Sequence, residues 1–600
     1  MAKTLPPRSD VRKEETWNAE SVFASPAAWE AERQAIEGAL PGLSQYPGTL
    51  GSGPTALANW LEAASALGRR LETLYFYAAM SQAVETSNMK ATAMVGQAGS
   101  LYSRYAAAAA FAQPEMLAIG EATLMRWTQD EPRLTVYTHY IRNLFRQQAH
   151  VRSGEVEEVL ALASDPFQAV SNTEQVLTSA DLKFTPATGQ DSESVEVAQG
   201  TIDTILHSAD RDARRSGWEN YADGYLSMKN TLASNYSAIV KRDVFYARSR
   251  RYESSLEAAL FPTNIPVEVF HNLVNTYKKH IPTWHKYWAV RRRALGVETL
   301  NPYDIWAPIS KTEPHIPFEQ SVEWICAGMQ PLGDDYVGVL RKGCLEDRWV
   351  DRAVNQGKTQ GAFSFGSYDT SPFILMSHDE SLAALSTLAH ELGHSMHSYL
   401  TRKNQPYVYS DYSMFVAEVA SNFNQAMVRD YLFRTNTDPQ FQIALIEEAM
   451  DNIHRYFFIM PTLARFELEA HQRAEQGQAL TADDLNELMA DLFSEGYGSE
   501  MQVDRDRVGI TWAQFGHLYA NFYVFQYATG ISAAHALSRR ILDGTPHAAA
   551  DYLSFLSAGS SLYPVDALKG AGVDMSTPDA VETTFGILAE YVDRLDQLTR

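Results

Sequence analysis

Most of the chain follows the 3.6-residue spacing of apolar side chains that is typical of amphipathic helices. Ala, Leu, Met, Arg and Glu dominate these stretches and prolines are few, so the composition favours helix as well. The pattern predicts helices over residues 27–40, 55–85, 88–112, 114–130 and 210–248. Ser25 is the expected N-cap of the first helix, with Pro26 in its first turn. The fold class predicted is therefore mainly α.

One stretch departs from the helical spacing. Residues 361–376 are rich in glycine and aromatic side chains and contain turn residues at Asp369–Pro372, which predicts a short β-hairpin. An exposed edge of that hairpin is suited to pair with an extended peptide backbone. A purely structural hairpin is the alternative. The residues assigned to this peptide-binding strand are Gly361, Ala362, Phe363 and Ser364.

The hairpin is followed by His-Glu-x-x-His inside an apolar, alanine-rich run. On a helix, His390 and His394 project from one face and are able to bind one Zn²⁺ together. Glu391, beside the first histidine, is placed to take a proton from a metal-bound water. The alternative is two surface histidines flanking a solvated glutamate, which the apolar surroundings disfavour. The segment predicts a metal site with a general base.

A catalytic zinc usually has three protein ligands, and Glu418 is the candidate for the third. It stands alone in an apolar helical stretch, where a carboxylate is costly to bury unless it is paired or bound to metal. A salt bridge to Arg402 or Arg429 is the alternative. His397 lies about 10 Å along the helix from His390, too far to share a tetrahedral zinc. It is assigned to substrate binding or to support of the ligands, with a plain buried histidine as the alternative.

An aromatic run near the C-terminus contains a second set of candidates. Tyr519, Tyr523 and Tyr527 share one face if the segment is a regular helix, which Gly530 would end. His517 joins them only from a loop or bend. Tyrosine and histidine donors stabilise the negative charge that develops on a carbonyl oxygen during amide hydrolysis. An aromatic stripe in a helical core is the alternative.

Composition narrows the setting of this chemistry. The net charge of −23 disfavours nucleic acid and acidic membranes as partners. Two cysteines in 600 residues fit a reducing compartment. The first residues lack the apolar core of a signal peptide, and no apolar run is long enough to span a bilayer. A cytoplasmic location is therefore expected, and residues 1–15 are predicted to be disordered.

These segments resemble peptidase family M3, and specifically its oligoendopeptidase F branch. The stretches that carry the resemblance are His390–His397, Phe415–Ser421, Gly361–Ser364, Phe522–Gly530 and, more weakly, Phe23–Glu30. The resemblance implies a two-lobed helical shell around a deep substrate channel, with a small hairpin or sheet beside the zinc helix. It also implies an N-terminal helical domain over residues 16–195 and a catalytic domain over residues 196–600.

The resemblance further implies the roles of the candidate residues. One Zn²⁺ per chain would be held by His390, His394 and Glu418, with Glu391 as the base. His517, Tyr523 and Tyr527 would bind substrate or stabilise the oxyanion, and Tyr519 would contact substrate. The implied activity is hydrolysis of internal bonds in short peptides, by a monomer or a homodimer.

Three alternatives to this activity stay open. Two are zinc enzymes of similar helical fold, a carboxypeptidase and a peptidyl-dipeptidase, which would act from a free chain end. The third is a non-catalytic peptide-binding protein with a structural zinc, which the presence of Glu391 disfavours.

Overall fold

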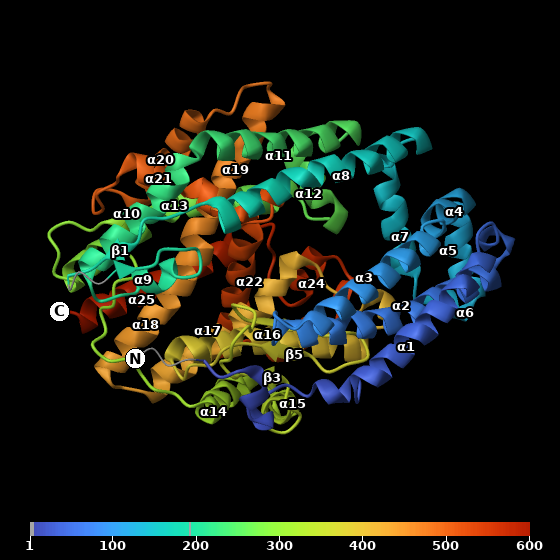
Figure 1. Cartoon of the computed structure of the whole chain (residues 1–600), viewed down its shortest axis with the longest axis horizontal. Coiled ribbons are helices and arrows are strands. Elements are labelled where there is room, and N and C mark those ends of the chain that lie inside the picture. The colour runs from blue at the N-terminus through green and yellow to red at the C-terminus, as the bar shows by residue number, and fades with distance from the viewer. Residues whose placement is uncertain (1–4, 191–193) are drawn as a thin grey trace. The chain divides into compact units, whose positions relative to one another are not determined.

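The structure is a computed structural model that describes residues 5–190 and 194–600 (Figure 1). The chain divides into two compact units, each assembled from three separated stretches. Unit 1 comprises Met1–Ala149, His315–Leu432 and Leu537–Gly572. Unit 2 comprises His150–Pro314, Phe433–Ala536 and Val573–Arg600. The predicted domain border at residue 195 coincides with no border between these units and stays a prediction about sequence domains.

Helices dominate unit 1, as predicted. Its first stretch contains α1 (Pro26–Ala39), α2 (Pro54–Ala83), α3 (Met89–Ala109), α4 (Ala112–Ile119), α5 (Glu121–Asp130), α6 (Pro132–Thr135) and α7 (Thr138–Gln147). The second contains α14 (Phe318–Met329), α15 (Asp334–Leu345), α16 (Leu382–Asn404) and most of α17 (Met414–Thr435). The third contains the end of α22 (Phe525–Leu542), α23 (Ala548–Leu556) and α24 (Pro564–Gly570).

Unit 2 is also mainly helical. It contains α8 (Gly154–Val176), α9 (Ile202–Leu206), α10 (Arg211–Ser227), α11 (Lys229–Ser249), α12 (Ser255–Leu260) and α13 (Val267–Ala294). Its later stretches contain α18 (Pro439–His454), α19 (Met460–Glu475), α20 (Ala482–Tyr497), α21 (Arg505–Gly509), the start of α22 and α25 (Asp579–Leu598). Strands β1 (Ala187–Thr188) and β2 (Ser194–Val195) pair antiparallel.

Local chemistry explains where the first helices begin and end. The Ser25 side chain accepts a hydrogen bond from the Ala28 backbone N–H at 3.2 Å, as predicted for an N-cap. The helix predicted over residues 114–130 is divided into α4 and α5 at Gly120. That glycine has φ +87°, a left-handed conformation that glycine adopts without steric cost. Periodicity alone did not reveal this break.

A three-stranded sheet lies beside α16. Strand β4 (Phe363–Phe365) pairs antiparallel with β5 (Phe373–Leu375), which confirms the predicted hairpin. Strand β3 (Val350–Asp351) pairs parallel with β5 on its other side, and the sequence pattern did not predict it. The strand order is β3-β5-β4, so β4 is an edge strand. Both β4 and β5 contact α16, which gives the expected small sheet beside the helix of the His-Glu-x-x-His segment.

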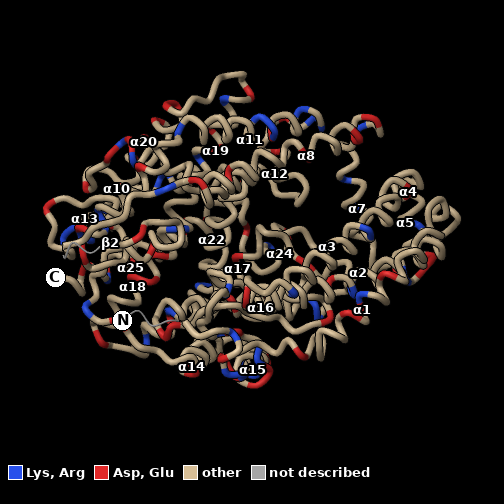
Figure 2. The backbone as a smooth tube through the Cα atoms, in the orientation of Figure 1, with Lys and Arg blue, Asp and Glu red and all other residues tan. Residues whose placement is uncertain are grey.

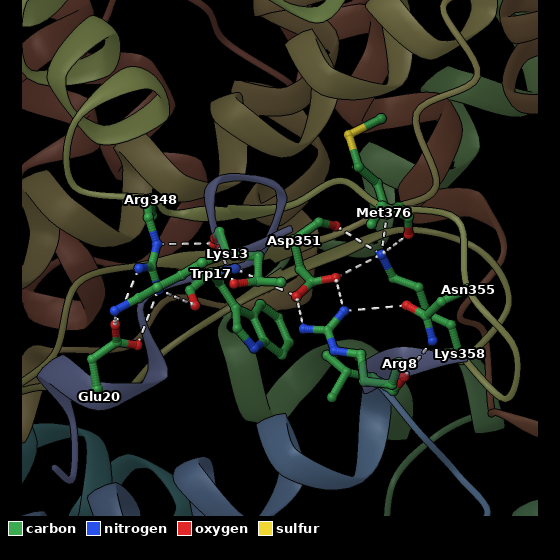
Figure 3. Close-up of polar contacts among 12 residues, drawn as sticks. Arg8, Lys13, Trp17, Glu20, Arg348, Asp351, Asn355, Lys358 and Met376 are labelled. Carbon is green, nitrogen blue, oxygen red and sulfur yellow. Dashed lines mark hydrogen bonds and ion pairs between the residues drawn. The ribbon is translucent and has the colours of Figure 1, made fainter. Parts of the chain in front are cut away.

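The predicted disorder of residues 1–15 is wrong over residues 5–15; residues 1–4 lie outside the described part. Arg8 donates to the buried carboxylate of Asp351 through both terminal nitrogens, one at 2.9 Å (Figure 3). The Lys358 ammonium donates to the same carboxylate at 2.8 Å. Because the Asp351 side chain is fully buried, its charge needs both cations. Arg8 and Asp351 are 343 positions apart in the sequence, so local sequence patterns could not predict their pairing.

Charged residues are distributed along the elements of both units. In the backbone trace of Figure 2, the positions of acidic and basic residues are interspersed along the described part of the chain. Within the described residues, no helix combines the length and the apolarity needed to cross a membrane.

The Asp351 cluster generates a stability prediction. Replacing Asp351 by alanine leaves the Lys358 ammonium buried without its carboxylate, because the Lys358 side chain is only 3% exposed. Such a loss is expected to destabilise unit 1 by about 3–5 kcal/mol. The urea midpoint of unfolding should fall accordingly. Arg12→Ala, which removes an exposed pair with Glu15, should leave the midpoint unchanged; equal midpoints for both variants would contradict the prediction.

Candidate active site

Helix α16 presents the His-Glu-x-x-His segment from the interior of unit 1. Ser381 caps its start by accepting the Ala384 N–H at 3.0 Å, and Arg402 and Lys403 lie in its last turn, where cations complement the helix dipole. Leu388, Leu392 and Met396 are all 0% exposed, so the apolar face that the sequence predicted is the buried one. The alternative of two surface histidines is contradicted by their own low exposure, 14% for the His390 side chain and 18% for that of His394.

Helix α17 crosses α16 at Gly393, the residue between Leu392 and His394. A Cβ at this position would lie 2.3 Å from the Ala420 carbonyl oxygen and 2.6 Å from Ser421 Cα. Only glycine leaves room for the α17 backbone to come this close. The Asn424 side chain donates to the Ala389 carbonyl at 3.1 Å and fixes the crossing one turn away. The close crossing brings Glu418 of α17 to the histidines of α16.

His390, His394 and Glu418 form the one group of three potential metal ligands among the described residues, with ligand atoms within 4.8 Å of one another. Glu418 Oε2 lies 3.4 Å from His390 Nε2 and 4.0 Å from His394 Nε2. The two imidazole rings are 4.9 Å apart and nearly perpendicular, at 81°. Ser421 also donates to Glu418 Oε2, at 3.1 Å. Arg402, one of the two alternative partners proposed for Glu418, instead donates to the Gly366 carbonyl.

A neighbouring side chain orients the imidazole of His390. His390 Nδ1 lies 3.1 Å from Gln425 Oε1, which only accepts, so Nδ1 carries a proton and Nε2 is the nitrogen that can bind a metal once it is deprotonated. Gln425 is itself held by its amide nitrogen, which donates to Ser386 Oγ at 2.8 Å. Sequence analysis missed Gln425, although its position seven residues after Glu418 places it on the same face of α17.

The charges of the three groups are strongly coupled. Burial alone lowers the pKa of His390, but the hydrogen bond and charge of Glu418 outweigh it and raise that pKa to about 9. Burial acts to raise the pKa of Glu418, yet His390 and His394 lower it to about 2. Burial and the charge on His390 lower the pKa of His394 to about 4. Near neutral pH the group therefore holds the Glu418 carboxylate, a protonated His390 and a neutral His394, and a divalent cation can take the place of the extra proton.

The donor set fits Zn²⁺. Ligand atoms of a tetrahedral zinc site, with bonds of about 2.0–2.1 Å, lie about 3.3 Å apart. The separation of His390 Nε2 and Glu418 Oε2 is close to that value, and a small closure brings His394 Nε2 to it. Two imidazoles and one carboxylate leave a fourth position for water or substrate.

Glu391 lies next to the group but does not join it. Its side chain is 5% exposed, and burial raises its pKa to about 7, with a further contribution from the charge of Glu418. The backbone N–H of Ser364 acts in the opposite direction. A carboxyl with a pKa near neutrality is suited to take up and return a proton.

The predicted peptide-binding residues divide at the start of β4. Phe363 and Ser364 belong to the strand, whereas Gly361 and Ala362 precede it. Gly361 has φ +84°. Ser364 Oγ lies 2.7 Å from Ser395 Oγ, which ties this edge strand to α16 directly beside His394.

His397 is the buried histidine that was kept as an alternative. It is 1% exposed and stacks on Tyr412 with ring centroids 3.7 Å apart and planes at 5°. Burial lowers its pKa to about 3, so the ring is neutral. The assignment to substrate binding is therefore wrong for this conformation, because a side chain so enclosed offers no surface to a peptide.

In unit 2, His517, Tyr523 and Tyr527 lie together. The hydroxyls of Tyr523 and Tyr527 are 2.7 Å apart. The His517 ring lies 6.1 Å from that of Tyr523, in parallel planes, and 6.0 Å from that of Tyr527. Burial and the charge of Arg455 lower the pKa of His517. The expectation that His517 reaches the tyrosines from a bend is met, since it lies in a 3-10 turn at Gly516–Tyr519.

The prediction that Tyr519, Tyr523 and Tyr527 share one face of a single helix is wrong. The chain leaves the 3-10 turn at Ala520, and α22 begins only at Phe525, so Gly530 lies inside α22 rather than at its end. Tyr519 consequently points elsewhere: its hydroxyl accepts from Asn235 at 3.2 Å and its ring packs on Tyr236. The geometry does not support a substrate contact for Tyr519.

Tyr456 joins this cluster and was missed. Its ring stacks on Tyr527 with centroids 5.1 Å apart and planes at 5°. It lies in a π-helical turn, Arg455–Ile459, between α18 and α19. Such turns change the helical phase and are frequent at functional sites. Apolar periodicity does not reveal a π-turn, so the sequence contained no usable signal for Tyr456.

Comparison with known proteins supplies independent information. A family model described as Peptidase family M3 matches residues 204–587, and one described as Oligopeptidase F matches residues 115–184. Oligopeptidase PepF of Bacillus subtilis is 38% identical over 100% of this chain and 89% of its own length. Group B oligopeptidase PepB of Streptococcus agalactiae is 34% identical over 98% of each chain.

Two solved structures resemble the whole chain. A putative peptidase from Chlamydophila abortus has a TM-score of 0.90 at 30% identity, covering 99% of this chain and 100% of its own. Oligoendopeptidase-F from Enterococcus faecium has a TM-score of 0.74 at 31% identity, covering 95% of this chain and 98% of its own.

The Gly393 crossing generates a prediction about metal binding. In Gly393→Ala the new methyl group overlaps the α17 backbone, so α17 must shift and move Glu418 away from the histidines. We expect the affinity for Zn²⁺ to fall at least about tenfold, measured by competition with a chelator. Gly338→Ala is the matched control, because a methyl group there meets no atom within 4 Å. Equal zinc affinities in the two variants would contradict the role given to the crossing.

Proposed function

The chain belongs to peptidase family M3 and is an oligopeptidase of that family, and we propose that it is a zinc-dependent endopeptidase cleaving internal bonds of short peptides. The observation that carries the proposal is the partly buried group of His390, His394 and Glu418 with the buried Glu391 beside it. Zinc bound there would lower the pKa of a water molecule towards about 7 and polarise the scissile carbonyl.

The residues of α16 and α17 supply the rest of the proposed chemistry. His390, His394 and Glu418 would be the zinc ligands, and Gln425 would keep His390 in the tautomer that offers Nε2. Glu391 would accept a proton from the attacking water and deliver it to the leaving amine. Its pKa of about 7 suits both transfers near neutral pH.

His517, Tyr523 and Tyr527 are proposed to donate hydrogen bonds to the developing oxyanion. The support is their convergence in unit 2, where two hydroxyls 2.7 Å apart point at one another beside an imidazole. One hydroxyl of such a pair can donate to the other while the second donates outward, which strengthens the outward bond. Tyr456 would hold the Tyr527 ring by stacking.

The edge strand β4 is proposed to align the peptide. A substrate in extended conformation would add to the sheet next to Phe363 and Ser364 by backbone hydrogen bonds, which do not depend on side-chain identity. The expected channel would limit access to short peptides, and that channel stays a prediction. The cytoplasmic location also stays a prediction, and monomer and homodimer both stay open.

The rival activities are separable by substrate. A peptide blocked at both ends offers no free terminus, so an endopeptidase cleaves it whereas a carboxypeptidase or peptidyl-dipeptidase does not. We expect the wild-type protein to cleave a doubly blocked, internally quenched peptide, and chelation of zinc to stop the cleavage. Glu391→Gln should lower kcat by about 10²- to 10⁴-fold, because it removes the base and leaves the ligands intact.

The control for Glu391→Gln is the zinc content of the same preparation. We expect about one zinc per chain in both proteins, measured by atomic emission. Full turnover by the variant would refute the role of Glu391, and failure of the wild-type protein to cleave the blocked peptide would refute the endopeptidase activity.

The tyrosine pair generates a separate prediction. If the Tyr527 hydroxyl donates mainly in the transition state, Tyr527→Phe should lower kcat by about 10²- to 10³-fold with little change in KM. Tyr523→Phe, measured in parallel, identifies which hydroxyl donates outward, since the other variant should lose less. Unchanged kcat in both variants would remove the pair from the mechanism.

A further inference from the structure

Unit 2 contains a buried carboxyl group that the proposed mechanism does not use. Glu467 of α19 is 0% exposed, and burial raises its pKa well above the usual value. Its Oε1 accepts a hydrogen bond from the backbone N–H of Phe522 at 2.7 Å, whereas its Oε2 has no hydrogen-bond partner in the structure. An apolar side chain at such a core position would avoid the free-energy cost of burying a carboxyl group, so the presence of Glu467 needs an explanation.

Phe522 is the strained residue of the segment that links the His517 turn to α22. Its φ is +47°, a left-handed conformation that side chains with a Cβ rarely adopt. Its ring is buried and packs on Phe270 and His471, with centroids 5.7 and 4.7 Å away. The burial fixes the ring, and the left-handed turn then directs the next residue, Tyr523, away from that core.

The turn determines the direction of Tyr523. Immediately after it, the Tyr523 N–H donates to the Ala520 carbonyl at 3.1 Å and the Tyr523 carbonyl accepts from Gln526 at 3.1 Å. These bonds lead the chain into α22, which carries Tyr527. A non-helical turn at Phe522 is therefore what brings the Tyr523 hydroxyl to within 2.7 Å of the Tyr527 hydroxyl.

A second buried contact holds the other end of the same segment. Arg242 of α11 donates to the Tyr519 carbonyl at 3.3 Å and pairs with Asp243. Asp243 faces His471 Nε2 at 3.4 Å, while His471 Nδ1 donates to the Glu467 carbonyl at 2.8 Å. The segment between Tyr519 and Phe522 is thus held at both ends by polar groups of α11 and α19.

We propose that Glu467 is a positioning residue for the reaction: by accepting the Phe522 N–H it holds the turn that sets Tyr523 against Tyr527 and His517. The inference rests on the proposed function, in which the Tyr523 and Tyr527 hydroxyls act on the substrate. Glu467 itself does not contact substrate and acts only by positioning that hydroxyl pair. What the site requires is a hydrogen-bond acceptor in the core, which glutamine can supply and methionine cannot.

The test compares Glu467→Gln with Glu467→Met, two side chains of similar length. With the doubly blocked peptide, we expect Glu467→Gln to keep kcat within about threefold of the wild type. Glu467→Met should lower kcat about 10- to 100-fold, because a small displacement of a catalytic donor has an effect of that size. KM and zinc content should change little in either variant.

Thr462→Val is the control for loss of a buried polar contact on the same helix. Thr462 is fully buried on α19, and its hydroxyl bonds to the Tyr277 hydroxyl at 3.1 Å and to the Phe458 carbonyl at 2.8 Å rather than to the 517–527 segment. We expect it to lower thermal stability and leave kcat unchanged. A merely structural Glu467 would behave in the same way, so wild-type kcat in Glu467→Met would overturn the inference, as would equal losses in the glutamine and methionine variants.

Two further measurements keep the outcome decisive. If Glu467→Met does not fold, Glu467→Asp replaces it, because the shorter side chain keeps a carboxyl group in the core but places it too far from the Phe522 N–H to accept its hydrogen bond. Glu467→Asp should turn over more slowly than Glu467→Gln; equal rates would overturn the inference. Wild-type and Glu391→Gln proteins are assayed alongside. An inactive wild-type protein would contradict the proposed function. An active wild-type protein whose kcat does not change on substitution of Glu467 would contradict this inference alone.

Discussion

Burial of the Glu418 carboxylate between two imidazoles is the interaction on which the site in unit 1 depends. An isolated carboxylate at that depth would be driven to its neutral form, yet His390 and His394 hold its pKa near 2. The arrangement exists because α17 approaches α16 as closely as a glycine allows, at Gly393. The small sheet then completes the surroundings, since Ser364 of β4 reaches Ser395 on the same helix. Backbone packing thus makes the electrostatics of the ligand group possible.

The two units solve a common problem in different ways. Reactive side chains must be partly buried to be held in place, and each burial demands a partner. In unit 1 the partners are side chains on neighbouring helices, such as Gln425 for His390. In unit 2 the segment that carries the tyrosines is held mainly through its backbone. Glu467 accepts the N–H of the strained Phe522, and Arg242 donates to the Tyr519 carbonyl. The second arrangement leaves the aromatic side chains themselves free to face one another.

Local sequence predicted what local physics determines. Helices, the Ser25 cap, the hairpin and the histidine pair on one helix face all follow from short-range spacing, and the structure confirms them. The convergence of His390, His394 and Glu418 was expected from the chemistry of a lone buried carboxylate and from the family resemblance. Features set by contacts distant in sequence were not predicted. These are the pairing of β3 with β5, the ion pair of Arg8 with Asp351, and the stacking of Tyr412 on His397. The prediction of one tyrosine face failed because the chain is not helical between Ala520 and Phe525, a stretch that includes the left-handed Phe522.

The pairing of Arg8 with Asp351 also bears on how the chain is made. The two residues are 343 positions apart, and unit 1 recruits its last stretch only from Leu537 onward. At translation rates of about 5–20 residues per second, Arg8 leaves the ribosome roughly 17–70 s before its partner is synthesised. The apolar faces of the first helices do not wait for that partner, because the buried side chains between Trp29 and Ile141 form a core among themselves. The pairing of Arg8 with Asp351 is therefore a late step, which fastens the N-terminal segment after the first helices have been able to pack.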